Sequence, residues 1–204
     1  MSIYFTADLH LGHAGIIRVR NRPFTDADEM NEALVQYYNA VVHKNDICYI
    51  LGDVAHKQSK DETVRLVKRL NGRKILIRGN HDGGIDNSLF DQVFVFEKIS
   101  CGSQVCVLMH YPMLSWPRSR HGSLMLHGHL HSDRSYNERN RDAGILRYDV
   151  GVDANNYCPV SFEQIRNFFG LPAARAAAYT QNQFDEHFGF TEKDLDGWED
   201  VELE

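Results

Sequence analysis

Histidine and carboxylate residues follow short apolar segments at several places along the chain. The first such segment, residues 3–7, is rich in β-forming residues and is followed by Asp8 and His10. In an extended chain, residues two apart point to the same side, so we expect both side chains to reach one point beyond the strand. An aspartate and an imidazole that converge in this way suit a divalent transition metal. Because Asp-x-His pairs are common by chance, the rest of the chain must complete such a site.

Four further segments place potential ligands after apolar runs. In chain order these ligands are Asp53, then Asn80 with His81, then His110, then His129 with His131. Seven of the 11 histidines lie in or beside the five segments, a placement that chance does not favour. Open α/β sheets bind ligands at the carboxyl ends of their strands. We therefore expect one shared centre built from all five loops.

Strand-like and helical segments alternate in the first half of the chain. Strands are expected at 3–7, 46–51 and 74–77, with an amphipathic helix at 26–42 and another after a capping box at Ser59. This order predicts a parallel sheet with right-handed crossovers. The second half differs, with strands expected at 93–99, 104–109, 123–126 and 145–150, joined by short links without a long helix. A second, mostly antiparallel or mixed sheet follows, and a capping box at Ser161 predicts a helix that ends at Phe169.

The composition indicates a soluble globular protein. The 204 residues are 43% apolar and 25% charged, and no segment approaches the roughly 20 apolar residues that span a bilayer. The start has no basic and apolar leader pattern, and the four cysteines form no CxxC pair, so we expect reduced thiols and a cytoplasmic location. The net charge of −6 is concentrated in residues 185–204, which hold nine acidic residues against one lysine. The preceding body is therefore mildly basic.

Taken together, the five segments resemble the calcineurin-like metallophosphoesterase superfamily, whose pattern is D-x-H, GD, GNH[DE], H and GHxH. The matching residues are Asp8-Leu9-His10, Gly52-Asp53, Gly79-Asn80-His81-Asp82, His110 and Gly128-His129-Leu130-His131. One block would be weak evidence, but five in order are strong. The resemblance implies an α/β fold, a four-layer α/β/β/α sandwich of two mixed sheets flanked by helices. We expect this domain at residues 1–170, with an acidic, partly helical extension at 171–204 packed on it.

The resemblance also implies two divalent metal ions. One would be bound by Asp8, His10, Asp53 and His131, and the other by Asp53, Asn80, His110 and His129. Mn²⁺ is the first expectation, with Fe, Zn²⁺ or Ni²⁺ as alternatives. A hydroxide bridging the metals would attack phosphorus, His81 would protonate the leaving oxygen, and Asp82 would orient His81.

Basic loops are expected to surround this centre. The proposed substrate contacts are His13, Arg18, Arg22, Arg118 and Arg120. Arginine pairs with phosphate, and the nearby Trp116 and Tyr136 could stack on a base. Solvated surface loops explain any single arginine equally well, and His13 either contacts substrate or only packs its turn.

These features predict a metal-dependent phosphoester hydrolase, specifically a phosphodiesterase acting on a small phosphodiester or nucleotide-like substrate. A phosphomonoesterase or a nuclease is the alternative that keeps the chemistry, although the chain shows no separate nucleic-acid-binding segment. A non-catalytic metal-binding scaffold is the alternative of another class. The sequence leaves the natural substrate, the native metal and the oligomeric state open.

Overall fold

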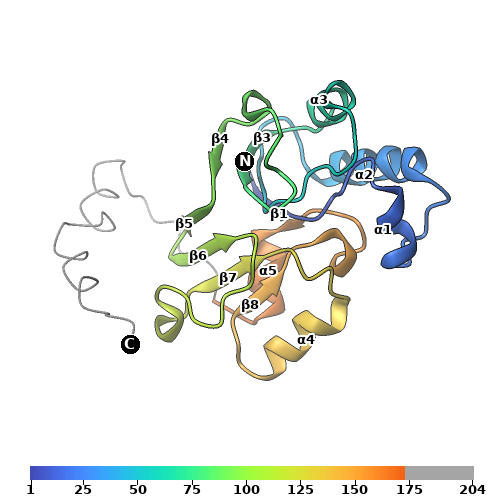
Figure 1. The fold of residues 1–204 in the computed structure, drawn as a ribbon. Coiled ribbons are helices and arrows are strands. Elements are labelled where there is room, and N and C mark those ends of the chain that lie inside the picture. The colour runs from blue at the N-terminus through green and yellow to red at the C-terminus, as the bar shows by residue number, and fades with distance from the viewer. Residues whose placement is uncertain (173–204) are drawn as a thin grey trace, which may run out of the picture. The chain divides into compact units, whose positions relative to one another are not determined.

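Two β-sheets form the centre of the part that this computed structural model describes, residues 1–172 (Figure 1). The first sheet has the strand order β4-β3-β2-β1-β9. Strands β1 to β4 run parallel to one another, and β9 is antiparallel to β1. The strands of this sheet are β1 (Ile3–Thr6), β2 (Ile47–Ile50), β3 (Arg73–Ile77), β4 (Gln92–Phe94) and β9 (Val160–Ser161). The predicted parallel arrangement of the first three strands is confirmed.

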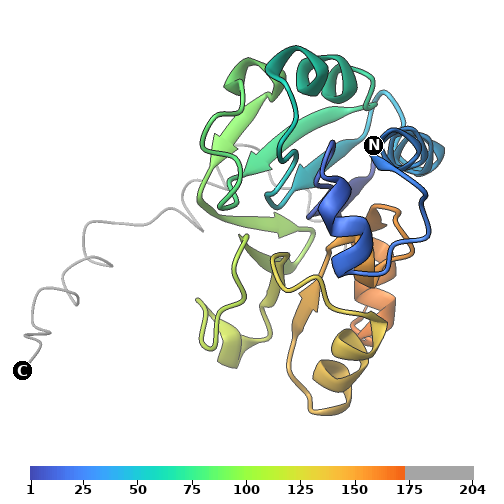
Figure 2. The same cartoon turned by 45° about the vertical axis from the view of Figure 1, so that its right-hand side comes forward.

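The second sheet has the order β5-β6-β7-β8. Strand β5 is antiparallel to β6, whereas β7 is parallel to both β6 and β8. Its strands are β5 (Phe96–Cys101), β6 (Gln104–Met109), β7 (Leu124–His127) and β8 (Arg147–Asp149). The sheet is therefore mixed, and Figure 2 shows it beside the first.

Helices α2 to α5 begin where the sequence supplies capping side chains, whereas α1 has no such cap. Asp26 accepts a hydrogen bond from the Glu29 N–H ahead of α2, and Ser161 forms the predicted capping box ahead of α5. The α-helices are α1 (Ala14–Val19), α2 (Ala27–Val41), α3 (Lys60–Lys68), α4 (Arg134–Asp142) and α5 (Phe162–Phe168). Three short 3₁₀ turns are η1 (Asn87–Leu89), η2 (Ser119–His121) and η3 (Val152–Ala154).

Alternate residues of the first sheet face two different cores. Ile50 and Leu76 belong to a cluster formed with the buried faces of α2 and α3. Leu51 and Ile77, each one residue further along, belong to a second cluster that includes Leu108 of the other sheet. This alternation is the period of two that places successive side chains on opposite faces. The two sheets thus pack face to face, with α2 and α3 on the outer face of the first sheet, and the predicted α/β sandwich of two mixed sheets is confirmed.

The strand expected at 93–99 is wrong as a single element. The chain forms β4 in the first sheet, breaks at Val95, and continues as β5 in the second sheet (Figure 1). Val95 is 62% exposed and pairs with neither sheet, so it marks the crossing. A continuous run of β-forming residues cannot reveal such a break, because the hydrogen-bonding partner of each residue is distant in sequence.

Helix α4 was also missed, since the strands expected at 123–126 and 145–150 were predicted to be joined without a long helix. Its buried residues are two asparagines, Asn137 and Asn140, so it has no apolar face for periodicity to detect. Asn137 instead hydrogen-bonds the backbone of Asp149, accepting from its N–H at 2.7 Å and donating to its carbonyl at 3.0 Å. The helix is held against β8 through polar contacts.

The predictions for the acidic extension, 171–204, lie outside the described residues except for its first two positions. The division of the chain at residue 170 therefore stays a prediction. Within residues 1–172, no helix has the length and apolar character needed to cross a membrane.

Candidate metal centre

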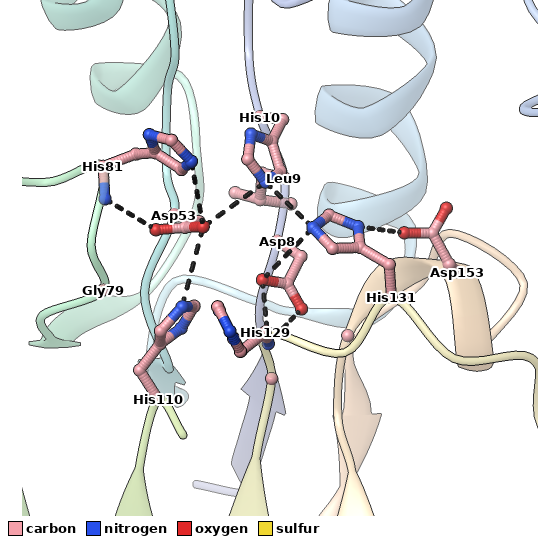
Figure 3. A network of polar contacts seen from close by, with 12 residues as sticks. Asp8, Leu9, His10, Asp53, Gly79, His81, His110, His129, His131 and Asp153 are labelled. Atoms are coloured by element: carbon pink, nitrogen blue, oxygen red, sulfur yellow. Dashed lines mark hydrogen bonds and ion pairs between the residues drawn. The ribbon is translucent and has the colours of Figure 1, made fainter. Parts of the chain in front are cut away.

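The predicted ligands come from loops that follow five strands. Asp8 and His10 follow β1, Asp53 follows β2, and Asn80 follows β3 in the first sheet. The remaining ligands follow strands of the second sheet, His110 after β6 and both His129 and His131 after β7. Figure 3 shows the side chains of the labelled ligands, which converge on one region together with His81. The structure thus brings all the predicted ligands to one edge of the sandwich.

The ligand atoms fall into two groups that share Asp53. Asp8, His10, Asp53 and His131 each offer one atom, and these atoms lie within 4.8 Å of one another. Asp53, His110 and His129 form the second group by the same measure. Asn80 joins the second group, because its Oδ1 lies 3.1 Å from His110 Nε2. This is the arrangement that two cations bridged by one carboxylate require.

Asp53 occupies the centre of the site. Its Oδ2 lies 3.4 Å from His10 Nε2, 3.6 Å from His110 Nε2 and 3.9 Å from His81 Nε2. Its Oδ1 accepts the His81 backbone N–H at 2.9 Å. The carboxylate is 2% exposed, so its position is fixed by the surrounding loops.

Hydrogen-bond acceptors face each other across the centre. This arrangement favours the binding of cations between them. His110 Nδ1 donates to the Leu51 carbonyl at 2.7 Å, so its Nε2 carries a lone pair toward Asn80 Oδ1. His131 Nδ1 bonds to Asp153 Oδ2 at 2.8 Å, and its Nε2 lies 3.1 Å from His10 Nε2. Lone pairs held this close repel unless a proton or a cation lies between them, and outer carboxylates of this kind orient metal-binding imidazoles.

The buried negative charge leads to the same conclusion. Burial, followed by the charge of Asp149, raises the pKa of Asp8 well above its usual value. Burial also opposes ionisation of Asp53, but hydrogen bonds from His10 and the His81 N–H outweigh it and lower that pKa to about 2. Divalent cations would compensate carboxylates crowded into a buried site. The donor set of carboxylate, amide and imidazole therefore fits transition-metal ions.

The backbone reason given for the convergence of Asp8 and His10 is wrong. Strand β1 ends at Thr6, and both residues have left-handed φ values, 58° and 50°. The backbone therefore turns sharply at each ligand instead of continuing extended. Asp53, His129 and His131 share this conformation, with φ values of 55°, 71° and 48°.

Two of the motif glycines leave room for this crowding. A Cβ at Gly52, whose φ is +88°, would lie 2.5 Å from His110 Nδ1. A Cβ at Gly128 would lie 2.5 Å from Ala7 Cβ and 2.7 Å from Asp8 Oδ2. Both distances are far below normal contact, so only glycine allows the loops to approach in this way.

Asp82 has a different partner from the one expected. Instead of orienting the His81 imidazole, its carboxylate accepts the backbone N–H groups of Asp53, Val54 and Gly79 at 2.8–2.9 Å. The side chain is 1% exposed. Asp82 thus ties the loop after β2 to the loop after β3, and it is a positioning residue for Asp53.

Arg22 was expected to contact substrate, and the structure buries it. Its guanidinium forms a two-bond pair with Asp153 at 2.8 and 2.9 Å, and donates to the Asp8 and Leu9 carbonyls at 2.8 and 3.0 Å. Arg22 as a whole is 3% exposed. Arg22 therefore braces the first metal-binding loop, and through Asp153 it is linked to His131.

The other proposed substrate contacts differ in their positions. The ring of His13 lies 5.4 Å from that of His10, whereas Arg18, Arg118 and Arg120 are exposed side chains on the surface. Burial, then the neighbouring histidines, lower the pKa of His13 to about 4.

Sequence reasoning missed four residues near the site. His56 lies with its ring 4.1 Å from that of His81, and Tyr111 Oη lies 3.4 Å from Asn80 Oδ1. Asp153 follows β8 just as the proposed ligands follow other strands, so the same signal of polar residues after an apolar run could have found it, whereas Asp149 is the last residue of β8 itself. His56 and Tyr111 carry no such signal.

The fold and the centre define a class, the metal-dependent hydrolases of phosphoric esters. Residues 1–155 match the family described as calcineurin-like phosphoesterase, and the chain belongs to that family. An uncharacterized protein of Methanocaldococcus jannaschii is 34% identical over 80% of this chain and 88% of its own length. The gene 66 protein of Mycobacterium phage L5 is 30% identical over 74% of this chain and 86% of its own.

A solved structure agrees with the fold. The crystal structure of a protein of unknown function from Aquifex aeolicus superposes with a TM-score of 0.64 and 27% identity. The superposition covers 81% of this chain and 98% of that one. The expected family, fold and enzyme class are therefore confirmed.

Proposed function

We propose that the protein hydrolyses phosphodiesters with two divalent ions, Mn²⁺ being the first choice. Asp8, His10, Asp53 and His131 would hold one ion, and Asp53, Asn80, His110 and His129 the other. The position of Asp53 supports this proposal most strongly, because a single buried carboxylate belongs to both groups of ligand atoms. We propose a small phosphodiester or nucleotide-like molecule as the substrate.

The ions, when bound, would lower the pKa of a water and offset the charge that develops at phosphorus. The chain itself would hold the acid, because His81 Nε2 lies 3.9 Å from Asp53 Oδ2 and its side chain is 33% exposed. An imidazole can carry a proton and give it up to a nearby oxygen, so His81 Nε2 can donate to the leaving oxygen. The hydrogen bond from the His81 backbone N–H to Asp53 holds the His81 residue beside the proposed metal centre.

The charges around the centre favour a diester over a monoester. A monoester dianion needs fixed positive charge beside the metals, but Arg22 is committed to Asp153 and to backbone carbonyls. The rings of His13, His56 and Tyr111 lie near the ligands on the more exposed side. A monoanionic diester requires less compensation. Arg18, Arg118 and Arg120 stay proposed contacts for more distant phosphates.

The test compares bis-p-nitrophenyl phosphate with p-nitrophenyl phosphate after loading with Mn²⁺, Fe²⁺, Zn²⁺ or Ni²⁺. We expect kcat/KM at least about tenfold higher for the diester. Asp53→Asn should lose bound metal and activity together. Turnover of neither ester with any metal would favour the non-catalytic scaffold, and a preference for the monoester would favour a phosphomonoesterase.

His81→Ala should keep both metals. Its hydrolysis rate should fall most for esters whose leaving group must be protonated. The loss should be about 10²–10⁴-fold for methyl phenyl phosphate, whose leaving group is poor, and much smaller for methyl p-nitrophenyl phosphate. His43→Ala is the matched control, because its side chain is 76% exposed and precedes β2 at the opposite end of the strand. Metal loss in His81→Ala, or equal losses for the two esters, would refute the assigned role.

A further inference from the structure

A cavity of about 250 Å³ opens beside the metal centre, and the proposed mechanism does not use it. It lies between the loop after β2, the first turns of α3, and the loop that leads from His81 to η1. His56 and His81 line it on the side of the proposed ligands, with their ring centroids 4.1 Å apart. One wall of the cavity is therefore the proposed acid itself.

The position of His81 determines what the cavity can hold. In an in-line displacement, the P–O bond to the leaving alcohol breaks on the side opposite the attacking oxygen, and that alcohol oxygen takes the proton from His81. Because the alcohol oxygen lies at His81, the rest of the leaving alcohol must lie next to this side chain. We infer that this cavity is the subsite for the leaving group, an inference that rests on the proposed function.

The lining indicates the class of leaving group. Ala55, Val64, Ile85 and Leu89 supply an apolar surface, and Leu89 is 9% exposed. The volume lies below the range of roughly 300–1,000 Å³ found for sites of drug-sized ligands, so it suits one ring system and no longer chain. The non-leaving side of the substrate must then lie outside this cavity.

Charged residues at the rim add a second requirement. Lys57 and Lys60 line the cavity and are exposed, against one carboxylate, Asp86. Asp86 is already engaged, since its Oδ1 accepts the Ser88 N–H at 2.9 Å. The excess of positive charge favours an anion. The leaving alcohol that fits is a ring-bearing one with its own negative group, a carboxylate or a further phosphate.

Two esters with the same non-leaving side test this inference, methyl 4-nitrophenyl phosphate and methyl 3-carboxy-4-nitrophenyl phosphate. We expect the wild-type protein to prefer the carboxylated ester, and Lys57→Gln/Lys60→Gln to reduce that preference about tenfold through kcat/KM of the carboxylated ester alone. Lys44→Gln/Arg139→Gln is the charge-matched control, because both residues are exposed and neither lines the cavity. An unchanged preference in Lys57→Gln/Lys60→Gln would overturn the inference.

A pair of adjacent glycines allows the cavity to be filled without straining the backbone. A Cβ at Gly83 or at Gly84 meets nothing within 4 Å, but only Gly84 lines the cavity. Gly84→Trp should lower kcat/KM for both esters at least about fivefold, and Gly83→Trp should leave it within twofold. Equal behaviour of the two variants would contradict the assignment.

A binding measurement separates this inference from the proposed function. In the metal-free protein, 3-carboxy-4-nitrophenol should shift the amide NMR signals of Thr63, Val64 and Ile85, and Gly84→Trp should abolish the shifts. If the wild-type protein hydrolyses neither ester with any metal, the proposed function fails. If it hydrolyses both while the phenol shifts none of these signals, the function stands and the subsite is wrong.

Discussion

Replacing Arg22 by methionine separates a structural role from a substrate-binding role. The guanidinium is fully buried, and its partners are Asp153, the Met30 sulfur and the carbonyls of Asp8 and Leu9. Methionine matches the length of the side chain but removes the charge and the donors. The Asp153 carboxylate, 8% exposed, would then keep only its bond with His131.

The expected cost follows from this burial. Removing one partner of a buried ion pair costs roughly 3–5 kcal/mol, because the remaining charge is left uncompensated. For a protein of this size, 1 kcal/mol shifts the melting temperature by about 2–4 °C, so Arg22→Met should lower it by about 10 °C. Metal-free protein is the right sample, since bound ions would add stability of their own.

Chemical denaturation in urea with a chelator measures the loss, and Arg18→Met is the matched control. Arg18 is exposed on α1, so its replacement should change the free energy of unfolding by less than about 0.5 kcal/mol. A cycle with Asp153→Asn should show that the double variant loses less than the sum of the single ones. Unchanged stability in Arg22→Met together with a raised KM would refute the reasoning and restore a substrate contact.

Three further predictions concern the loops. Gly128→Ala forces a Cβ to 2.7 Å from Asp8 Oδ2, and calorimetric titration with Mn²⁺ should show affinity reduced at least about tenfold. Asp82→Asn puts an NH₂ group among three backbone donors, and should cost about 3 kcal/mol in the same urea assay. Burial opposes ionisation of Asp153, yet hydrogen bonds from its two partners hold its pKa at about 2. Its contribution to stability is therefore complete above about pH 4 and lost as pH falls toward 2, so the urea midpoint should fall more steeply there in wild type than in Asp153→Asn.

Most of the proposed centre could be predicted because each ligand directly follows a buried strand. Apolar runs indicate the strands, and parallel strands bring their carboxyl ends to one edge, so ligands far apart in sequence were expected together. Asp153 follows β8 in the same way, so the same signal also indicates this residue. What the sequence could not supply was the partner of each polar side chain. Arg22 and Asp153 are separated by 131 positions, and no local pattern links them.

Structural elements without an apolar pattern were not predicted from the sequence, for a related reason. Helix α4 buries two asparagines and holds β8 by hydrogen bonds, so hydrophobic periodicity has nothing to detect. The break at Val95 separates two strands that differ only in the sheet they join. In both cases the structure is decided by hydrogen-bonding partners, whereas the patterns used for prediction report only burial.

The left-handed backbone at the ligands shows how the centre is held. Five of the seven proposed ligands have φ between 48° and 71° without being glycine, and such conformations cost on the order of 1 kcal/mol each. They persist because other contacts determine the loops, among them the three N–H bonds to Asp82 and the close approach of Gly128 to Asp8. None of these contacts involves a metal. The strain is therefore balanced by contacts within the folded chain, and the same contacts position the loops that carry the proposed ligands.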